Sequence, residues 1–572
     1  MGLVTNDVIR WLILLAWLLA CGIAWLVTFI RYNTADEFYY TRYLMGAGLP
    51  VARACALVLN LNSMLILFPV CRNLISYLRG SFETREFYRK NIRRQLDKNI
   101  TFHKLLAYAI MVMTTVHIIA HCFNMQNMLR AKQETDETLE NTLSNFPQTG
   151  DRWVNPIKNA PRNSKLGFGL IEQVIATTAG WTGAVLTLAF LLMISSSTEF
   201  LRRSYFETFW YSHHLFVLYY AMLLAHGTGG LVRRQINTAE HDPKTCAEHH
   251  RDWPTDQCAT PTFGGSAAAS WKWCIFPLCA YFLERLLRVF RSSQNVIITK
   301  VVNHPSRVIE LRMSKKNFKA LPGQYIFMKC PSLSRLQWHP FTLTSAPEDK
   351  YFSVHIRCVG DWTNGLAEAV GALLQEPLPA SQLPRIAVDG PFGTSSTDIF
   401  GYRVAICVAA GIGVTPFASV LKSIQYKLTS QDENMLLKKV YFFWVCSDTQ
   451  SFEWFNTQLG ELEQCLTEMG RNDFFDYAVC LTRGWSLSQA KNIYLQEEQE
   501  LDAITGLMQK THYGRPRWPS NFAKIAEDNP GERIGVFFCG PKSLSHILHK
   551  CCNEYSNRKG RGTIFVYNKE NF

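Results

Sequence analysis

The sequence lacks the cysteine patterns that would place it in several common protein classes. Its 17 cysteines include no CxxC pair and no Cys/His spacing of a zinc finger. They are too scattered for the dense disulfide framework of a small secreted domain, so we expect most to be free thiols. The chain also has no internal repeat and no low-complexity tract. These absences exclude a zinc-finger protein and a disulfide-rich secreted domain.

The net charge of +13 does not indicate a partner made of nucleic acid, because the basic residues concentrate beside apolar runs. Five runs are uncharged and span-length, at 11–30, 54–70, 105–123, 174–197 and 209–232. A sixth run, at 271–290, contains Lys272, Glu284 and Arg285. The first run has no small-residue cleavage site, so we expect a membrane anchor there and not a cleaved signal peptide.

The basic loop between the second and third runs indicates the orientation of the chain. It carries Arg72, Arg79, Arg85, Arg89, Lys90, Arg93, Arg94 and Lys98. The positive-inside rule therefore predicts a cytosolic loop, cytosolic termini and an even number of spans, which favours six. Segments 124–166 and 233–270 are then external. Cys246 and Cys258 share the second of these, where oxidising conditions would allow a disulfide.

Four histidines lie in two of the apolar runs, His103 and His117 in one and His213 and His226 in the other. Histidine is expensive in lipid, and two such helices could clamp two stacked haems. The first pair lies within about 40° on a helix, about 21 Å apart along its axis. The second pair is about 140° out of phase unless a bend intervenes. Spacing does not choose between His213 and His214, and some of these histidines could instead cap helices.

The segment 292–393 predicts a small antiparallel β-barrel. Short β-rich runs such as VIITKVV, QYIFMKC and YFSVHIR alternate there with Gly/Pro turns. Within it lie His339, Pro340, Phe341, Thr342, Arg357, Trp362 and Thr363. An aromatic–Thr pair can stack on a flat ring, and Arg357 can neutralise a pyrophosphate. A buried phenylalanine and a structural arginine explain the same residues about as well.

The segment 394–572 predicts an α/β domain that binds a nucleotide. The apolar run 404–410 leads into Gly411-Ile412-Gly413-Val414-Thr415-Pro416 and an apolar helix. Glycines let the backbone approach a phosphate, and a helix N-terminus attracts its charge. A second strand, 534–538, ends in Cys539-Gly540-Pro541, at the strand end where α/β folds bind ligands.

Together these features resemble the superoxide-generating NADPH oxidases, over essentially the whole chain. The resemblance includes the runs LFPVCRNL at 67–74, RSYFE at 203–207 and NKENF at 568–572. The runs WVNPI at 153–157, HGTGG at 226–230 and KCC at 550–552 look closer to the colon-type, non-phagocytic branch than to the phagocyte one. The resemblance implies a six-helix transmembrane haem bundle over 1–291, a ferredoxin-reductase-like FAD β-barrel and an α/β NADPH-binding domain.

The resemblance also implies roles for residues. It selects His213 over His214, and it pairs His103 with His213 on the cytosolic side and His117 with His226 on the outer side. FAD would bind at residues 339–342, Arg357, Trp362 and Thr363, and the NADPH phosphates at Gly411, Gly413, Thr415 and Pro416. Nicotinamide would lie near Cys539, Gly540 and Pro541, and Phe572 would stack on the flavin.

One departure concerns the 2′-phosphate of NADPH. Relatives usually carry an arginine after the cysteine at position 446, whereas this chain has Ser447. Arg515 remains. Arg483 interrupts a sequence that in relatives is usually an unbroken Thr-Gly-Trp. NADPH selectivity is therefore expected to depend on Arg515, with Arg483 as a compensating cation.

The oxygen site is expected near the outer haem. Arg53 begins the second span from outside, and His121 lies one helical turn beyond His117. The family places such a pair at the oxygen site, where a cation would stabilise superoxide as it forms. An arginine that snorkels to headgroups or pairs with a haem propionate is the alternative.

The resemblance implies electron transfer from cytosolic NADPH through FAD and two bis-histidine b-type haems to external O2, giving superoxide at the plasma membrane. The implied partners are a small membrane α subunit of flavocytochrome b, cytosolic organiser and activator proteins and a Rac-type GTPase. One alternative is a ferric or cupric metalloreductase, which predicts an external metal site; His241, His249 and His250 are interpreted as solvated loop instead. The other alternative is a non-enzymatic proton channel or scaffold.

Overall fold

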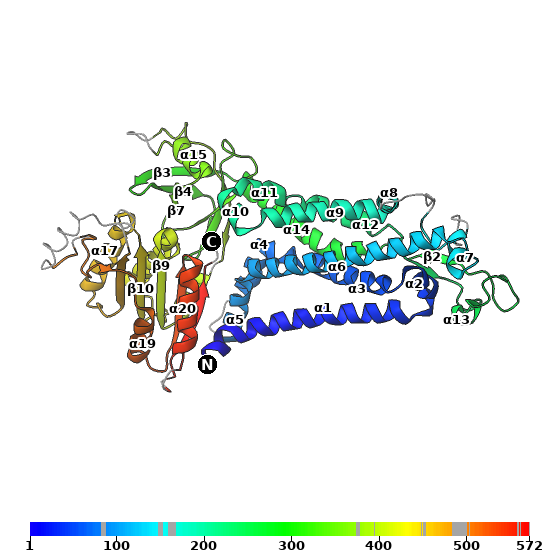
Figure 1. Cartoon of the computed structure of the whole chain (residues 1–572). Coiled ribbons are helices and arrows are strands. Elements are labelled where there is room, and N and C mark those ends of the chain that lie inside the picture. Colours follow the sequence, from blue (N-terminus) through cyan, green and yellow to red (C-terminus); the bar gives the residue numbers. More distant parts are fainter. Residues whose placement is uncertain are drawn as a thin grey trace. The chain divides into compact units, whose positions relative to one another are not determined.

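The computed structural model describes residues 1–81, 87–146, 153–157, 168–372, 378–393, 395–447, 449, 453–482, 500–502, 504–557, 560 and 562–570. These residues form two compact units. We call Leu14–Cys71 with Ile100–Leu283 the membrane unit, and Met1–Ile13, Arg72–Asn99 and Glu284–Phe572 the dehydrogenase unit. Figure 1 labels the elements of both units.

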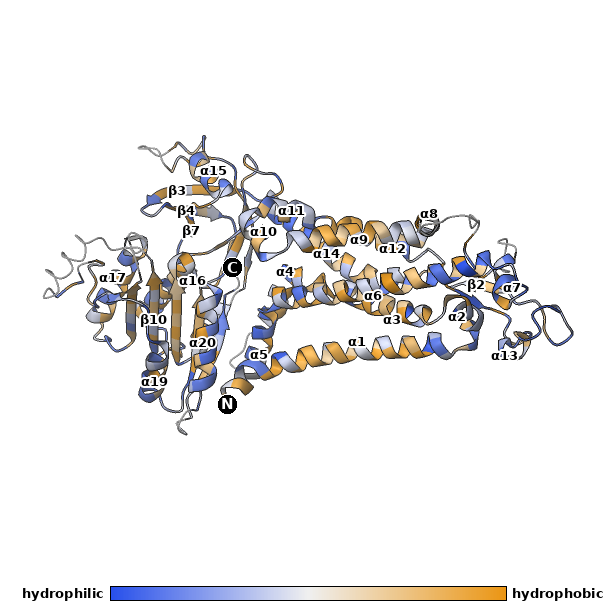
Figure 2. Cartoon of the chain, in the orientation of Figure 1, coloured by the Kyte–Doolittle hydropathy of each residue, from blue (hydrophilic) through white to orange (hydrophobic). Residues whose placement is uncertain are grey.

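Long apolar helices make up most of the membrane unit (Figure 2). They are α1 (Ile9–Thr34), α3 (Gly48–Leu65), α6 (Asn99–Gln133), α9 (Thr178–Ser196), α12 (Phe216–His226) and α14 (Ser270–Ser293), joined by the shorter α2 (Tyr39–Met45), α7 (Leu139–Asn145), α8 (Phe168–Ala176), α10 (Glu199–Ser204), α11 (Phe206–His213) and α13 (Pro243–Cys246). Four helical segments among the described residues are long and apolar enough to cross a membrane: Val4–Thr34, Gly48–Val70, Asn99–Gln133 and Thr178–Ser196.

The fifth expected span is shorter than the sequence predicts and is broken in two. α11 ends at His213 and α12 begins at Phe216. Between them the amides of His214 and Leu215 donate to the carbonyls three residues earlier, the pattern of a tighter turn. Helix α12 then ends at His226, well before the expected limit of 232. The chain thus has the bend that the spacing of His213 and His226 demands.

The segment after α12 is held together by several polar contacts. Strand β1 (Arg233–Gln235) pairs with β2 (Phe263–Gly265), and Cys246 and Cys258 form a disulfide, as their shared loop allowed. The interpretation of His241 as solvated loop is wrong. Its side chain is fully buried, with Nε2 2.5 Å from the Tyr40 hydroxyl and Nδ1 bonded to the Ala259 carbonyl.

The dehydrogenase unit contains the expected antiparallel barrel. One sheet has the order β3 (Val296–His304), β4 (Val308–Lys315), β7 (Phe352–Arg357), and the other the order β6 (His339–Thr342), β5 (Tyr325–Lys329), β8 (Ala387–Phe392). Alternate residues Ile309, Leu311 and Met313 of β4 are buried in the barrel core. Helix α15 (Asp361–Ala369) contributes Trp362 and Leu366 to the same core.

The α/β domain is a doubly wound parallel sheet. Its order is β12 (His512–Tyr513), β11 (Phe475–Leu481), β10 (Lys439–Cys446), β9 (Val404–Ala410), β13 (Arg533–Cys539), β14 (Ile564–Lys569). The core on one face includes residues of α16 (Thr415–Thr429) and α17 (Glu453–Glu468), and the core on the other includes α19 (Trp518–Asp528) and α20 (Lys542–Tyr555). The chain order reverses at β9, so the switch point lies between β9 and β13.

The basic loop belongs to the dehydrogenase unit. It forms α4 (Arg72–Ser81) and α5 (Phe87–Leu96). Arg79 and Arg93 are both buried and both contact Asp398, at 2.9 Å and 2.7 Å, and Lys90 Nζ donates to the Gly401 carbonyl. These basic residues therefore attach the loop to the α/β domain of the same unit.

The amino-terminal residues cover the edge of the parallel sheet. The side chain of Asn6 donates from Nδ2 to the Phe565 carbonyl at 3.1 Å, and its Oδ1 accepts from the Tyr567 backbone amide at 2.9 Å, as the backbone of a neighbouring strand would. Arg94 of α5 donates to Asn6 Oδ1 and to the Tyr567 carbonyl, both at 2.9 Å. We call Asn6 and Arg94 the edge clamp, because they occupy hydrogen-bonding groups that edge strand β14 would otherwise expose.

Candidate redox-cofactor sites

Two pairs of histidine rings face each other in the membrane unit. The ring centroids of His103 and His213 are 6.2 Å apart, and those of His117 and His226 are 6.3 Å apart. A metal–imidazole bond is about 2 Å long, so two nitrogens on opposite sides of one metal lie about 4 Å apart. Adding the ring radius on each side brings the ring centres to about 6 Å. Each pair therefore has the spacing of two axial ligands of one iron.

All four rings have their Nδ1 atoms occupied by groups from other helices. Nδ1 of His103 lies 2.9 Å from the Ile66 carbonyl, that of His117 2.9 Å from the Ala52 carbonyl, that of His213 3.2 Å from Ser197 Oγ and that of His226 3.0 Å from Thr182 Oγ1. Metal-binding histidines commonly use their second nitrogen in this way, which fixes the ring and leaves Nε2 for the metal. The four residues thus fit two haem irons.

His214 lies in a different environment. Its Nδ1 is 2.6 Å from the carbonyl of Trp210, in its own helical turn. Its ring packs edge-on against Trp210, and no other histidine ring faces it among the described contacts. The geometry therefore distinguishes two neighbours that helical spacing could not separate.

Two hydroxyl groups of this site, those of Thr182 and Ser197, were not expected from the sequence. Thr182 is fully buried in α9, and Ser197 is the C-cap of the same helix. The only sequence feature that could have indicated these two partners is a hydroxyl inside or at the end of an apolar run. Threonine and serine in such runs usually donate to a carbonyl of their own helix. Thr182 does so too, to the Ala179 carbonyl at 3.3 Å, so sequence alone provides no reason to single it out.

Arg53 and His121 lie beside the His117 ring. The rings of His117 and His121 are 4.6 Å apart, and Asn124 Nδ2 lies 3.4 Å from His121 Nδ1. Arg53 follows directly after Ala52, whose carbonyl binds His117. The Arg53 guanidinium lies 5.1 Å from the Tyr32 ring centre, and its buried Nε has no hydrogen-bond partner among the described residues. A cation with unused donor capacity therefore lies close to the second histidine pair.

The barrel carries an aromatic stack on its expected flavin-binding strand. The ring of His339 lies 4.1 Å from that of Trp362, and the ring of Phe341 lies 5.9 Å from it. Burial lowers the pKa of His339 to about 4, so this imidazole is neutral at physiological pH. Thr363 accepts hydrogen bonds from the amides of Val359 and Gly360, each at 3.1 Å. These contacts hold the start of α15 against β6.

Arg357 lies at the end of strand β7 and is exposed. Pro340 and Thr342 belong to β6, and Thr342 is buried. The structure thus brings the residues of the expected FAD site onto β6, the end of β7 and the first turn of α15. An exposed guanidinium near a flat aromatic surface fits a flavin dinucleotide with its pyrophosphate.

The two nucleotide motifs meet at the carboxyl ends of neighbouring strands. Strand β13 pairs with β9, with Cys539 opposite Ala409. A Cβ on Gly413 would lie 2.6 Å from the Cys539 carbonyl, and Gly540 has a φ of +159° with Ala410 close by. A side chain on either glycine would collide with these neighbours, and both glycines lie at the switch point of the sheet. Pro416 and Thr415 begin α16 there, so its N-terminus can receive a phosphate.

The residues expected at the 2′-phosphate follow other strands on the same edge. Ser447 is exposed after β10, and Arg515 is exposed just after β12. The carboxyl ends of parallel strands share one edge, so Arg515 lies on the nucleotide side of the sheet. Arg483 and Phe572, the other two expected participants, lie outside the described residues.

Glu570 is a buried carboxyl near the end of the chain. Its Oε1 accepts from Ser395 Oγ at 3.0 Å, from the Ser396 amide at 2.7 Å and from Ser396 Oγ at 2.5 Å. Burial, with a smaller contribution from the charge of nearby Asp97, raises the pKa of Glu570 to about 7 despite these bonds. No sequence pattern marked this carboxyl as one that would be buried.

Comparisons with known proteins cover the whole chain. Residues 58–224 match "Ferric reductase like transmembrane component", 293–396 match "FAD-binding domain" and 402–553 match "Ferric reductase NAD binding domain". The chain is 47% identical to NADPH oxidase 3 of Homo sapiens, over 100% of this chain and 99% of that protein. It is 46% identical to NADPH oxidase 1 of Mus musculus, over 99% of this chain and 94% of that protein.

A more distant relative also aligns over nearly the full length. NADPH oxidase 4 of Mus musculus is 36% identical, over 99% of this chain and 98% of that protein. The colon-type branch expected from the sequence is represented among these relatives by NADPH oxidase 1, at nearly the same identity as NADPH oxidase 3.

Proposed function

This chain belongs to the NADPH oxidase family, and from that premise we propose which of its residues hold each redox group. The protein is a membrane oxidoreductase that moves electrons from NADPH to O2 across the bilayer, producing superoxide. When bound, FAD takes the hydride of NADPH as an electron pair, and two b-type haems carry the electrons singly.

We propose that His103 and His213 hold one haem iron and that His117 and His226 hold the other. The observation that supports this most is the combination of ring spacing with the occupied Nδ1 atoms. Ser197 and Thr182 orient two of the ligand rings, and backbone carbonyls of the α3 region orient the other two. If each iron took its histidine pair, the haems would supply one-electron transfer, and these residues would leave no position on the iron for O2.

We propose that the flavin ring binds beside the His339, Phe341 and Trp362 stack and that Arg357 pairs with its pyrophosphate. Gly411 and Gly413 let the NADPH phosphates approach the backbone, with Thr415 and Pro416 opening the helix that receives them. Cys539, Gly540 and Pro541 form the adjoining wall for nicotinamide. Phe572 would cover the flavin until nicotinamide displaces it, and Arg515, with Arg483, would hold the 2′-phosphate.

The oxygen site is proposed beside the second histidine pair. Arg53 supplies a buried positive charge whose Nε has no protein partner among the described residues, and His121 packs on the His117 ring. A cation fixed at the haem edge favours the reduction of O2, because it stabilises the negative charge that develops on superoxide. His121 and the neighbouring Asn124 can order a water molecule there.

The setting of the enzyme is likewise a proposal. We place it in the plasma membrane with both termini in the cytosol, supported by the basic loop of α4 and α5. The proposed partners are the small membrane α subunit of flavocytochrome b, organiser and activator proteins and a Rac-type GTPase. We propose no nucleic-acid partner, because the basic residues concentrate beside the apolar runs.

The metalloreductase alternative lacks support in the structure. It requires a metal site in the external loops, yet His241 is buried and bonded to Tyr40. Among the described residues, the only group of candidate metal ligands lies in the barrel of the dehydrogenase unit. The full-length relatives are named as oxidases, and this also weighs against a scaffold without redox activity.

The decisive experiment is an electron-acceptor assay on purified protein in sealed vesicles. NADPH is added to the side that carries the dehydrogenase unit, and cytochrome c to the opposite side. We expect cytochrome c reduction that superoxide dismutase abolishes. Reduction that persists with the dismutase, or that requires ferric or cupric ions, would contradict the proposed function.

A further inference from the structure

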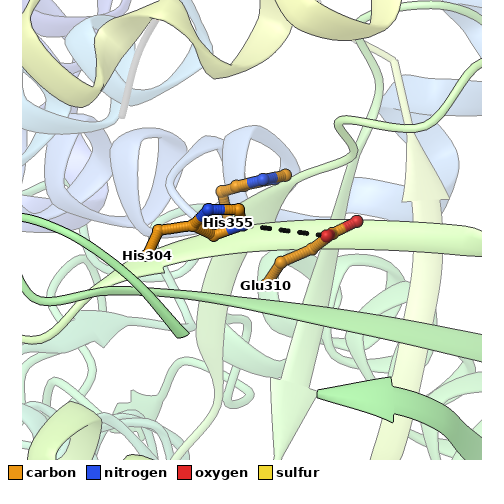
Figure 3. A group of neighbouring side chains, drawn as sticks. All are labelled: His304, Glu310 and His355. Atoms are coloured by element: carbon orange, nitrogen blue, oxygen red, sulfur yellow. Dashed lines mark ion pairs between the residues drawn. The ribbon is translucent and has the colours of Figure 1, made fainter. Parts of the chain in front are cut away.

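Three potential metal ligands of the barrel lie close together (Figure 3). Strand register explains why they meet. Glu310 of β4 is directly opposite His355 of β7, and on its other side opposite Val302 of β3. His304 lies two residues beyond Val302, so it projects from the same face of the sheet. We call His304, Glu310 and His355 the barrel triad.

The distances within the barrel triad suit one metal ion. One donor atom from each residue lies within 4.8 Å of the others, and His304 Nε2 is 3.8 Å from Glu310 Oε2. The centroids of the two imidazole rings are 5.2 Å apart. Two imidazoles on one tetrahedral metal, with bonds of about 2 Å, have ring centres about 5 Å apart. The distance between the two ring centres is therefore close to that of two imidazoles on one ion.

The two imidazole rings each have a nitrogen available for a metal, but their hydrogen bonding differs. Nδ1 of His355 lies 2.8 Å from Thr344 Oγ1, which orients the ring and leaves Nε2 available. His304 Nε2 is buried and has no hydrogen-bond partner in the part of the chain that the structure describes. A buried nitrogen in that state is costly, and a bound metal would satisfy it.

Arg312 is the one feature that opposes a cation. Its Nε and Nη2 bind the two oxygens of Glu310 at 2.8 and 3.1 Å. A carboxylate has about four lone-pair sites, so Glu310 can bind a metal through Oε2 and keep the arginine on Oε1. The positive guanidinium will still weaken metal binding, and its side chain is one-third exposed, which gives it room to move.

We propose that the barrel triad is a binding site for a divalent transition metal of the zinc class. Two histidine nitrogens and one carboxylate oxygen are a common three-ligand set for Zn2+, with water in the fourth position. The site would join β3, β4 and β7. His355 also stacks on Trp454 of α17, with ring centres 4.2 Å apart, so a bound ion would stiffen this contact between barrel and α/β domain.

The test measures zinc on the purified full-length holoenzyme after chelator treatment. Equilibrium dialysis against buffered Zn2+, with zinc counted per FAD, gives the number of ions bound and their affinity. We expect His304→Gln and His355→Gln each to bind one equivalent less than wild type, with unchanged flavin and haem content. His249→Gln, which removes an exposed histidine of the membrane unit, is the matched control and should keep the full number.

A second variant separates a metal site from a purely structural cluster. Arg312→Gln removes the repelling charge but none of the proposed ligands, so it should bind Zn2+ about tenfold more tightly. A structural role of the cluster would not predict any gain in zinc affinity. Equal zinc stoichiometry in wild type and both histidine variants would overturn the proposal, and so would weaker binding in Arg312→Gln.

Discussion

Single side chains decide which histidines of the membrane unit can hold iron. His213 and His214 are adjacent in sequence, but only the His213 ring lies opposite His103. We expect His213→Leu to remove one b-type haem signal and to stop electron transfer, because a low-spin bis-imidazole iron cannot persist with one ligand missing. The measurement is the reduced-minus-oxidised spectrum with haem quantified per protein.

The matched control for this prediction is His214→Leu, which should retain both haems. Thr182→Val adds a milder test, since it keeps His226 but removes its Nδ1 partner. Loss of such an outer partner typically lowers metal affinity by about 10- to 100-fold. Full haem content in His213→Leu together with loss in His214→Leu would reverse the assignment.

We expect Arg53 to affect the rate at which O2 is reduced and not the retention of haem. Arg53→Ala should keep both haem spectra and the reduction of flavin by NADPH. It should slow reoxidation of the outer haem by O2 by about tenfold or more, because the developing negative charge loses its cation. Stopped-flow spectroscopy measures this rate. Haem loss in the variant would instead indicate that Arg53 pairs with a propionate.

Arg515 is expected to distinguish NADPH from NADH. It is exposed at the nucleotide edge of the sheet, and Ser447 offers no positive charge. A lost charged hydrogen bond costs about 1.5–3 kcal/mol, so Arg515→Ala should raise the KM for NADPH about tenfold or more. The KM for NADH should hardly change in the same steady-state assay. An equal rise for both nucleotides would mean that Arg515 has only a structural role.

Glu570 makes the stability of the dehydrogenase unit depend on pH. Its folded pKa of about 7 lies above the ordinary value of 4.5, because burial disfavours the charged form. The folded state then binds more protons than the unfolded state between these values. The contribution of this group to stability is highest below pH 4.5 and falls as pH rises toward 7, by about 3 kcal/mol at most.

Glu570→Gln tests this dependence, because glutamine stays neutral and can still accept from Ser395 and Ser396. We expect the variant to gain thermal stability over wild type near pH 8 and to match it more closely near pH 5, since only wild type carries the buried charge at the higher pH. Flavin release on heating measures the midpoint. A difference in midpoint that does not vary with pH would contradict the role of Glu570.

At the scale of elements, the edge clamp ties a helix start, a loop helix and a sheet edge together. Arg94→Ala would leave the Tyr567 carbonyl and Asn6 Oδ1 without this donor in a buried position. We expect a loss of about 2–4 kcal/mol in stability of the α/β domain, seen as earlier flavin release on heating. Arg403→Ala breaks a half-exposed ion pair with Glu532 and should cost less than about 1 kcal/mol.

The sequence predicted those helices and strands that are recognisable from a short run of neighbouring residues. The strands at 404–410 and 534–538 appear where buried apolar runs precede glycine motifs, and β13 pairs with β9 as the doubly wound fold requires. The sequence predicted the break at His214 only indirectly. The helical phase showed that one straight helix could not place His213 and His226 on the same face. What decided its position is a pair of backbone hydrogen bonds that no residue pattern specifies.

Contacts between distant segments could not be predicted from sequence. Ser197 lies 16 residues from His213, and Asn6 lies 561 residues from Tyr567. An asparagine near an apolar run is usually a helix cap or a solvated residue, so nothing marked Asn6 as the partner of a strand. The basic residues of the loop are visible in the sequence, but the ion pairs of Arg79 and Arg93 with Asp398 could be found only in the folded structure.

At the scale of the whole molecule, the chain separates two kinds of chemistry into two units. The membrane unit offers paired imidazoles and a buried cation, and the dehydrogenase unit offers flat aromatic surfaces and bare backbone. Loop residues 72–99 lie between two helices of the membrane unit in sequence, yet they pack within the dehydrogenase unit. The chain therefore passes between the two units at several points and not through a single linker.

The edge clamp has a consequence for biosynthesis. Residues 6 and 565 are 559 residues apart in the chain, yet the side-chain amide of Asn6 donates to the Phe565 carbonyl. At about 5–20 residues per second, roughly half a minute to two minutes separates their synthesis. The segment around Asn6 must therefore remain without this partner until strand β14 emerges. A nascent chain cut short before β14 would keep its membrane helices but leave this waiting segment unpaired, a mark by which quality control could recognise it.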